Sequence, residues 1–398
     1  MKNKWAVRVT SIIIAAVLIY VGYIGWNKYL DAREYVDGAE WVVPLDDSYT
    51  YEDNYARKLN KNLEKLNLWA ISKACRQEDS FYERLYGVTN NKGKVIIPAV
   101  YERIEIDPNQ NYILAINDAL ENYHYYKLDG SDFIKDSFQY ADLFENGYAC
   151  VVKKERPYII DAEGKVILRV ECESLEKLDG SRGLFKFTVK NTSKDVLQEY
   201  NSFSGLIDLN GNIVLEPKYE NIEKASENRI LVTFIDEEGY SRNVYLDNNF
   251  QQVSKASYEA ATVYEQGAAV VKDSKGWCII NEKEESIARI TGCKEMYGFS
   301  EGIAVALYEN KLKYYDTKGT LLFAVPYKES DLNPSYEMYT YQEGFIVFPG
   351  KNNKKGYMDS KGNVIVEPAF TRAASVENGE ALVTMLGKKG VIKLKKSN

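Results

Sequence analysis

The stretch Phe299-Ser300-Glu301-Gly302-Ile303-Ala304-Val305 is one copy of a phrase that returns along the chain and decides the fold. Close copies begin at Phe144, Tyr264 and Val376, and looser copies contain Gly183 and Gly344. The glycines of these copies stand at 147, 183, 267, 302, 344 and 379, so most steps are 35 to 42 residues. The step from 183 to 267 is double, with Asn228 in the place of the missing glycine. A fixed period of this size indicates a repeat architecture, and such folds usually bind other molecules.

A second phrase follows each copy and predicts a tight hairpin. One example runs from Gly356 through Asp359 and Gly362 to Phe370, and the stretch from Gly205 to Tyr219 resembles it closely. An aspartate at the start of a turn can bond its own backbone two residues on, and glycine supplies the positive φ that closes the turn. Short runs rich in Val, Ile and Tyr flank each turn, which is the strand-turn-strand signal. Each repeat therefore has about the strand content of a propeller blade.

With both phrases identified, the chain resembles the bacterial WG-repeat proteins. Residues 299–304 match the opening strand of that repeat, and residues 205–217 and 356–368 match its second half. The Trp-Gly pair itself is mostly eroded, since Trp277 keeps the Trp position but Cys278 stands where Gly is expected. The resemblance covers about residues 86 to 394. It implies a repetitive β architecture with a binding or scaffolding role, and no catalytic signature comes with it.

The number of repeats predicts the size of the domain. Eight hairpin turns lie between Gly93 and Gly362, and a final partial copy follows at Gly390–Leu394. We therefore expect an all-β, propeller-like domain over residues 86–398 with about eight four-stranded blades. The chain starts and ends within a repeat, which suits a closed ring in which strands from both termini complete one blade. An open β-solenoid, capped at each end, is the alternative.

The N-terminal region predicts a membrane anchor. Residues 1–8 carry Lys2, Lys4 and Arg8, and residues 9–26 are uncharged and largely apolar. Eighteen residues of helix span about 27 Å, enough for the apolar core of a bilayer. The positive charge before the span predicts a single-pass protein of the cell membrane, with a cytoplasmic tail and an extracytoplasmic repeat domain. A cleaved signal peptide is the alternative, although this stretch is longer than the usual apolar region of one.

Residues 27–85 form a predicted linker that contains one amphipathic helix. Between Tyr51 and Ala74 the apolar residues Tyr55, Leu59 and Leu63 recur at helical spacing, with lysines on the other face. We expect this helix to pack on the repeat domain or to act as a stalk; a dimerising or partner-docking helix is the alternative. The stretch 41–45 just before it is a candidate strand that docks on the ring.

Charge and composition restrict the partners and the chemistry. The net charge of −7 becomes −10 beyond the tail, and no basic run interleaved with aromatics occurs, so a nucleic-acid partner is not expected. No nucleotide-binding, serine-hydrolase or zinc-protease motif is present. We therefore predict no catalytic, cofactor or metal residues.

The residues that could carry chemistry have structural explanations. His124, the one histidine, falls on a repeat strand, where an ordinary hydrogen bond is expected. Cys150 and Cys278 fall among apolar strand residues and are expected to be small buried side chains. The turn aspartates predict hairpin capping rather than calcium binding, because no turn has the acid density of a calcium loop. These aspartates are Asp161, Asp208, Asp247, Asp316 and Asp359.

The 32 tyrosines offer the best indication of a ligand surface. The aromatic residues eight positions after the turn glycine are expected in the core; they are Tyr101, Tyr219, Tyr258 and Phe370. Tyr336, Tyr339 and Tyr341 instead crowd a longer insertion, and insertions in repeat folds often form the binding face. Tyrosine suits sugar or peptide ligands because it combines a flat apolar ring with a hydroxyl. Loop aromatics folded back on the domain are the alternative.

These observations predict a membrane-anchored binding or scaffolding module for a macromolecular partner, protein or glycan, at the cell envelope. A structural, oligomer-forming envelope component is one alternative. A glycan hydrolase with paired carboxylates is another, but no pair stands out among 58 acidic residues. The oligomeric state does not follow from the sequence.

Overall fold

The described residues of the computed structural model are 36–74, 84–106, 111–181, 183–191, 202–326 and 340–395, and they form an all-β, propeller-like fold. Nine small antiparallel sheets are present in them, six with four strands and three with three. Two compact units divide the chain: residues 50–324 form one, and residues 1–49 with 325–398 form the other.

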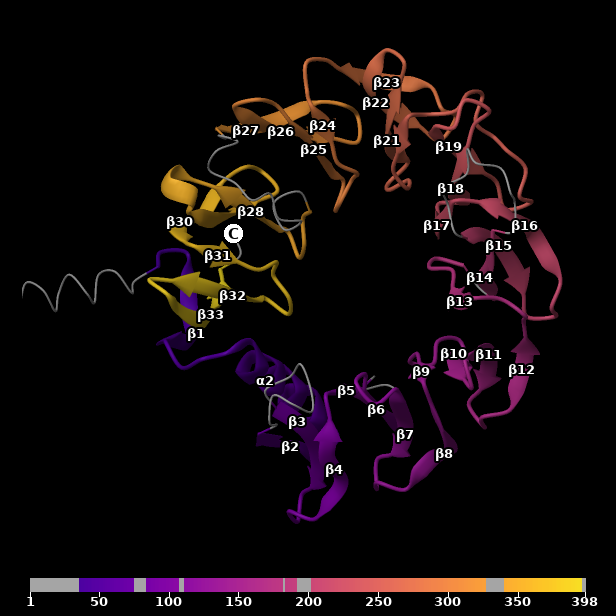
Figure 1. The fold of residues 1–398 in the computed structure, drawn as a ribbon. Helices are drawn as coiled ribbons and strands as arrows, with labels where there is room; N and C mark the ends of the chain where they lie inside the picture. The colour runs from indigo at the N-terminus through magenta and orange to yellow at the C-terminus, as the bar shows by residue number, and fades with distance from the viewer. Residues whose placement is uncertain are drawn as a thin grey trace, which may run out of the picture. The chain divides into compact units, whose positions relative to one another are not determined.

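The unit of residues 50–324 contains seven sheets that follow one another in sequence order (Figure 1). The first sheet has β2 (Leu68–Ala74), β3 (Arg84–Asn90) and β4 (Val95–Tyr101). The second has β5 (Arg103–Ile106), β6 (Tyr112–Asn117), β7 (Asn122–Lys127) and β8 (Asp132–Phe138). The third has β9 (Tyr140–Ala141), β10 (Tyr148–Lys153), β11 (Arg156–Asp161) and β12 (Val166–Arg169). The fourth has β13 (Ser174–Lys177), β14 (Leu184–Lys190), β15 (Ser202–Asp208) and β16 (Ile213–Tyr219).

The remaining sheets of this unit have the same build. The fifth has β17 (Asn221–Ser226), β18 (Arg229–Ile235) and β19 (Ser241–Leu246). The sixth has β20 (Ala260–Ala261), β21 (Ala268–Asp273), β22 (Gly276–Asn281) and β23 (Ser286–Ile290). The seventh has β24 (Glu295–Met296), β25 (Ile303–Leu307), β26 (Lys311–Asp316) and β27 (Leu321–Pro326). Each sheet of this unit is therefore an antiparallel meander of strands that follow one another in the sequence.

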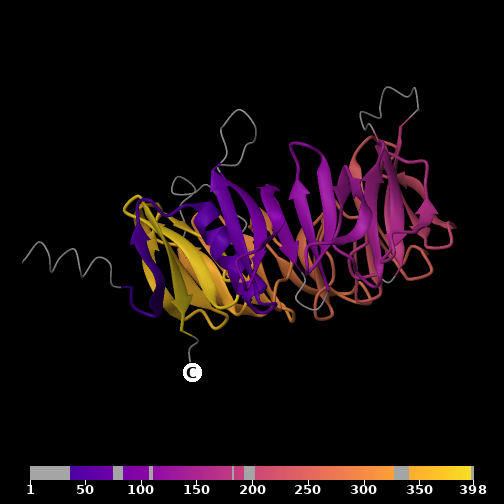
Figure 2. The same ribbon diagram turned by 90° about the horizontal axis from the view of Figure 1, so that it is seen from below.

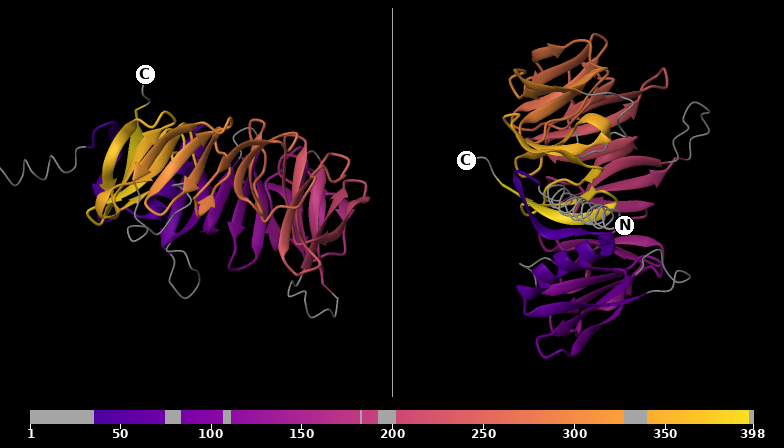
Figure 3. Two further views of the ribbon diagram at one scale, coloured as in Figure 1. Left: turned by 90° about the horizontal axis from the view of Figure 1, so that it is seen from above. Right: turned by 90° about the vertical axis from the view of Figure 1, so that its left-hand side faces the viewer.

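The second unit contains two sheets, and one of them joins the two ends of the chain. β28 (Phe345–Pro349), β29 (Lys355–Asp359) and β30 (Val364–Phe370) form one sheet, with the short 3-10 helix η3 (Lys351–Asn353) between its first two strands. β31 (Arg372–Ala373), β32 (Glu380–Met385) and β33 (Lys388–Leu394) form the other, and β1 (Ala39–Asp46) adds to β33 as its fourth strand (Figure 3). The prediction that strands from both ends complete one blade is confirmed.

The number of sheets corrects the prediction of about eight four-stranded blades. The eight predicted hairpins are present, but the sheet of β31–β33 has no such hairpin because its last strand comes from the N-terminal side. Counting hairpins therefore misses one sheet. The fifth sheet has three strands because residues 250–258 make only isolated bridges, Leu246 to Gln252 and Asn243 to Tyr258.

The recurring phrase forms a two-residue hairpin between the edge strand and the second strand of a sheet. In one copy Asn146 and Gly147 have φ of 52° and 86°, and the backbones of Glu145 and Tyr148 bond each other in both directions. Positive φ at both central residues is the requirement of a type I′ turn, which explains the glycine. Asn228, predicted to replace a glycine, has φ of 62°.

The second phrase forms the hairpin between the last two strands. In each predicted turn, one aspartate oxygen accepts the backbone N–H groups two and four residues on, at 2.7–3.1 Å. Asn90 and Asn281 do the same in their turns. Hairpin capping by Asp161, Asp208, Asp247, Asp316 and Asp359 is therefore confirmed.

A glycine that lies against the backbone of the partner strand marks the most regular repeats. A Cβ on Gly356 would lie 2.3 Å from the carbonyl oxygen of Val366, and the register of β29 and β30 shifts at this point. Gly205 of β15 stands at the equivalent register shift, where its Cβ would lie 2.7 Å from the carbonyl oxygen of Leu215. Only glycine allows so close an approach of two backbones.

Tyrosines tie three of the sheets to the sheet that follows in the sequence. The hydroxyl of Tyr245 donates to the carbonyl oxygen of Thr262 at 2.7 Å, and that of Tyr357 donates to Ala374 at 2.7 Å. Tyr125 bonds the carbonyl oxygen of Asp142 in the same way, again 17 residues on. These three side chains are fully buried. The core positions predicted for Tyr101, Tyr219, Tyr258 and Phe370 are also confirmed.

The predicted amphipathic helix is present but shorter than expected. α2 (Tyr51–Glu64) begins at a capping box of Thr50 and Asp53, and its ribbon lies beside the first sheet (Figure 2). Its Leu59 and Leu63 are buried in the core of the first two sheets. The predicted continuation to residue 74 is wrong, because residues 68–74 form β2 instead. Asn67, with φ of 55°, ends the helical path, and β2 pairs with β3 along its whole length.

The predicted transmembrane segment 9–26 lies outside the described residues. Within the part of the chain that the structure describes, no helix has the length and the apolar character needed to cross a membrane.

Candidate functional site: an acidic groove

The site is built on the edge strands of four successive sheets. In β5, β13 and β17, and at the end of β9, a buried apolar residue is followed at once by an acid. Successive side chains of an extended chain point to opposite sides. The apolar residues are Ile104, Ala141, Leu175 and Ile222, and the acids are Glu105, Asp142, Glu176 and Glu223. Packing of the apolar residue in the core therefore directs the acid away from the core.

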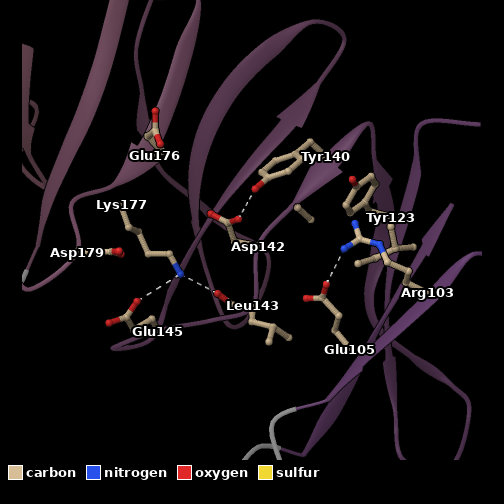
Figure 4. Close-up of a pocket in the computed structure, with 12 residues that line it drawn as sticks. Arg103, Glu105, Tyr123, Tyr140, Asp142, Leu143, Glu145, Glu176, Lys177 and Asp179 are labelled. Carbon is tan, nitrogen blue, oxygen red and sulfur yellow. Dashed lines mark hydrogen bonds and ion pairs between the residues drawn. The ribbon is translucent and has the colours of Figure 1, made fainter. Parts of the chain in front are cut away.

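These acids line two adjoining hollows. Figure 4 shows the first of them. The first has a volume of about 400 Å³, and its polar lining includes Arg103, Glu105, Asp142, Glu145, Glu176, Lys177 and Asp179. The second, of about 320 Å³, shares Glu176, Lys177 and Asp179 and adds Lys186 and Glu223. We call these nine residues the acidic groove. It holds six carboxylates and three cations.

Each cation of the groove is paired. Arg103 lies 3.3 Å from Glu105 and 3.2 Å from Asp118. Lys177 donates to the carbonyl oxygen of Leu143 at 2.9 Å and lies 3.6 Å from Glu145. Lys186 lies 3.2 Å from Glu176. The cations are therefore held by the groove itself and leave part of its negative charge without a counterion.

Three carboxylates carry that remaining charge. Asp142, Asp179 and Glu223 form no salt bridge within the described residues. Burial raises the pKa of Asp142, although the hydroxyl of Tyr140, 2.6 Å away, opposes the rise. Burial likewise raises the pKa of Glu223 and of Glu105. A raised pKa means that the ionised form is poorly solvated, so an incoming cation would relieve the cost of that charge.

Asp142 has the most closely fixed position of the three. Its N–H donates to the carbonyl oxygen of Cys150 at 3.0 Å, and its own carbonyl oxygen accepts from the buried hydroxyl of Tyr125. Tyr140 then orients the carboxylate. Both the backbone and the carboxylate of Asp142 are therefore held in place before any ligand binds.

The predicted ligand surface of three tyrosines is not an exposed surface at Tyr341. That side chain is 2% exposed, and its hydroxyl donates to the carbonyl oxygen of Asp359 at 3.2 Å. Tyr341 is a core residue because it belongs to the repeat phrase of its sheet. The turn of that phrase, with its bridge between Gln342 and Phe345, leads directly into β28. Tyr336 and Tyr339 lie outside the described residues, and their role stays a prediction.

The other singled-out residues have structural roles. His124 lies in β7 with Nε2 3.0 Å from an Asp132 oxygen, as the expected ordinary hydrogen bond. Cys150 and Cys278 are buried, as predicted. Among the described residues, no group of three or more potential ligands has the geometry of a metal site.

Sequence reasoning missed the acidic groove. An apolar-acid pair opens each of four successive repeats, a few residues before the turn phrase, and this was the available signal. It stands out only when the edge strands are aligned by their hydrogen bonds, because acids are frequent everywhere in the chain.

Comparisons with known proteins agree with the repeat. Three segments, residues 86–117, 205–237 and 356–388, match the family model described as WG containing repeat. These segments begin at or beside Gly87, Gly205 and Gly356, whose added Cβ would in each case meet the backbone of the partner strand. Where Cys278 replaces this glycine, β22 and β23 pair without a register shift at that residue, and no match is found.

No curated protein matches the sequence. Among solved structures, Kluyveromyces lactis Hsv2 is similar at 9% identity and a TM-score of 0.34, over 74% of this chain and 93% of that chain. The AfRom2 CNH domain is similar at 8% identity and a TM-score of 0.32, over 74% and 94%. Likenesses this distant carry no argument about function.

Proposed function

We propose that this chain is a membrane-anchored, non-catalytic binding module whose acidic groove takes a basic segment of a protein partner at the cell envelope. The observation that carries the proposal is the row of four acids on successive edge strands, with three carboxylates that have no cation of their own. WG repeats on a propeller-like fold are typical of a protein-binding module.

The shape of the groove supports a binding role rather than catalysis. Its acids come from four different sheets along two open hollows, and none of them lies beside His124, the one histidine. A lysine or arginine chain lying across the edge strands could meet Asp142 and Glu223 in turn. Charge pairing in a partly desolvated site favours a basic segment over a neutral one.

Binding of defined peptides tests the groove. The full chain in detergent is titrated into fluorescein-labelled tetralysine and into its tetraglutamine counterpart, and fluorescence anisotropy is recorded. Tetralysine should bind, and the double variant Asp142→Asn, Glu223→Gln should weaken that binding about tenfold, through two lost charge contacts. Glu171→Gln is the matched control, since Glu171 is exposed outside the groove. Equal binding of both peptides would refute the proposal.

The location is tested separately, because it rests on the sequence of residues 9–26. The full chain and a version that begins at residue 36 are expressed, and the membrane fraction is washed with high salt and carbonate. The full chain should stay in the membrane and the shortened chain should not. Release of the full chain by the washes would contradict the anchor.

A partner is tested by photo-crosslinking in intact cells. A photo-crosslinking residue at Asp179 should give an adduct with a partner, and one at Ser360 is the control.

A further inference from the structure

A second feature beside the groove is an aromatic slot. It has a volume of about 190 Å³ and lies between the start of α2, the strand β3 and the residues that begin β5. Its lining is Tyr51, Glu52, Tyr55, Tyr86, Glu102 and Arg103. The tyrosines give it an apolar surface, although it opens on the surface of the molecule, where Tyr51 is 51% exposed.

Two of the three tyrosine rings of the slot, those of Tyr55 and Tyr86, are held in place by hydrogen bonds. The hydroxyl of Tyr55 accepts from the N–H of Ile104 at 2.7 Å and donates to its carbonyl oxygen at 3.0 Å. The hydroxyl of Tyr86 donates to the carbonyl oxygen of Glu52 at 3.2 Å. The two rings meet edge to face with centroids 4.9 Å apart. A preformed slot loses little entropy when an apolar group enters it.

The slot adjoins the acidic groove at Arg103. Arg103 lines both, and its pairing with Glu105 and Asp118 fixes the guanidinium at their border. The slot is smaller than the sites that hold drug-sized ligands, which start at about 300 Å³, so it has room for a single side chain. A ligand that fills both features therefore has one large apolar group close to its positive charge.

We infer that the slot and the groove together recognise one peptide chemistry, a large apolar residue next to basic residues. This inference rests on the proposed function, since the groove must bind a basic segment for the slot to select among such segments. Complementary charge directs the basic side chains to the groove, and the tyrosine rings bury the apolar one. The slot thus supplies selectivity that charge alone does not give.

Matched peptides test the inference. Fluorescein-labelled Gly-Ser-Lys-Lys-Phe-Gly-Ser and Gly-Ser-Phe-Lys-Lys-Gly-Ser cover both orders, and each is compared with the peptide in which Ala replaces Phe. Burial of a phenylalanine side chain predicts at least about tenfold tighter binding for one Phe peptide than for its Ala partner to the full chain in detergent. The variant Tyr51→Ala should reduce that preference to about twofold, and Tyr240→Ala, which changes an exposed tyrosine elsewhere, should leave it unchanged.

The outcomes separate this inference from the proposed function. If all the basic peptides bind equally well and better than a Gln-Gln-Phe peptide, the groove binds but the slot selects nothing, and the inference is overturned. A preference for Phe that survives Tyr51→Ala overturns it as well, because the apolar residue then binds elsewhere. If no basic peptide binds, the proposed function fails and the inference fails with it. Tyr51 is half exposed, so its replacement leaves the core in place, and unchanged thermal unfolding verifies this.

Discussion

The change of Tyr245 to Phe tests whether the repeated tyrosines tie neighbouring sheets together. Tyr245 lies in β19 with a fully buried side chain, and its hydroxyl donates to the carbonyl oxygen of Thr262 just after β20, at 2.7 Å. Its ring packs on those of Tyr258 and Tyr264. Phenylalanine keeps this ring packing and removes only the hydroxyl. The variant therefore isolates one hydrogen bond between two sheets.

The expected loss of stability follows from the removal of that hydrogen bond. A net hydrogen bond contributes about 0.5–1.5 kcal/mol, and an acceptor left buried without a donor costs about 1–3 kcal/mol. The structure shows no second donor to the carbonyl oxygen of Thr262 within the described residues. We therefore expect Tyr245→Phe to lower the free energy of local opening by about 1–3 kcal/mol.

Hydrogen exchange is the suitable assay, because a chain of two compact units need not unfold in one step. Peptides that cover β19 and β20 should exchange about 5- to 150-fold faster in the variant, provided that their opening is local. Tyr240→Phe is the matched control: Tyr240 precedes β19 in the same hairpin and is 59% exposed, so its effect should stay within about 0.5 kcal/mol. If Tyr245→Phe is as neutral as the control, the tyrosine hydroxyls do not join the sheets, and the abundance of tyrosine needs another explanation.

Three further predictions follow from the same geometry. Tyr125→Phe should weaken tetralysine binding, since Tyr125 holds the backbone of Asp142, whereas Tyr245→Phe should not; equal affinities, measured by anisotropy, would count against a positioning role. Asp142→Asn should raise the melting temperature at pH 7, because burial raises the pKa of this carboxyl and its ionised form costs stability. That gain should shrink as pH falls towards about 4, the usual pKa of an unfolded Asp, where the native carboxyl is already protonated; a constant gain in a melting series across pH would refute the reasoning. Asp359→Ala should cost about 1–2 kcal/mol in urea unfolding, since two backbone N–H groups lose their acceptor, while Asp359→Asn should be nearly neutral, as Asn281 caps its own turn in this way.

Turn chemistry is the part of the fold that the sequence predicts best. The turn glycines and aspartates act locally, through φ and through bonds to backbone atoms two and four residues away, so their effect is written in consecutive residues. Asn228 shows this, since its positive φ could be predicted from its place in the repeat alone. The regular spacing then gave the number of hairpins, eight, without any knowledge of packing.

The errors arise where partners distant in sequence decide. Residues 68–74 fit a helical apolar spacing, but their pairing with β3 makes them a strand. The ninth sheet escaped the count because β1 and β33 come from opposite ends of the chain. The place of Tyr341 in a long insertion predicts a binding face, whereas its hydroxyl donates to a carbonyl oxygen 18 residues on. Local patterns do not contain these contacts.

The acidic groove could not be predicted for a related reason. In seven sheets, the residue just before the edge strand donates its backbone N–H to a carbonyl oxygen of the second strand. The side chain three positions after that residue is not fully buried in the core. In chain order these residues are Glu105, Asp142, Glu176, Glu223, Thr262, Tyr297 and Ala374. Only the first four are acidic, and they are consecutive. The adjacent apolar residue is fixed by packing, but this position is free to vary from repeat to repeat without loss of the fold. Four acids in successive sheets, followed by Thr, Tyr and Ala, therefore concentrate negative charge on one group of sheets. This concentration is the feature that the proposed basic partner would recognise, and it arises at a position that can change its side chain without loss of the fold.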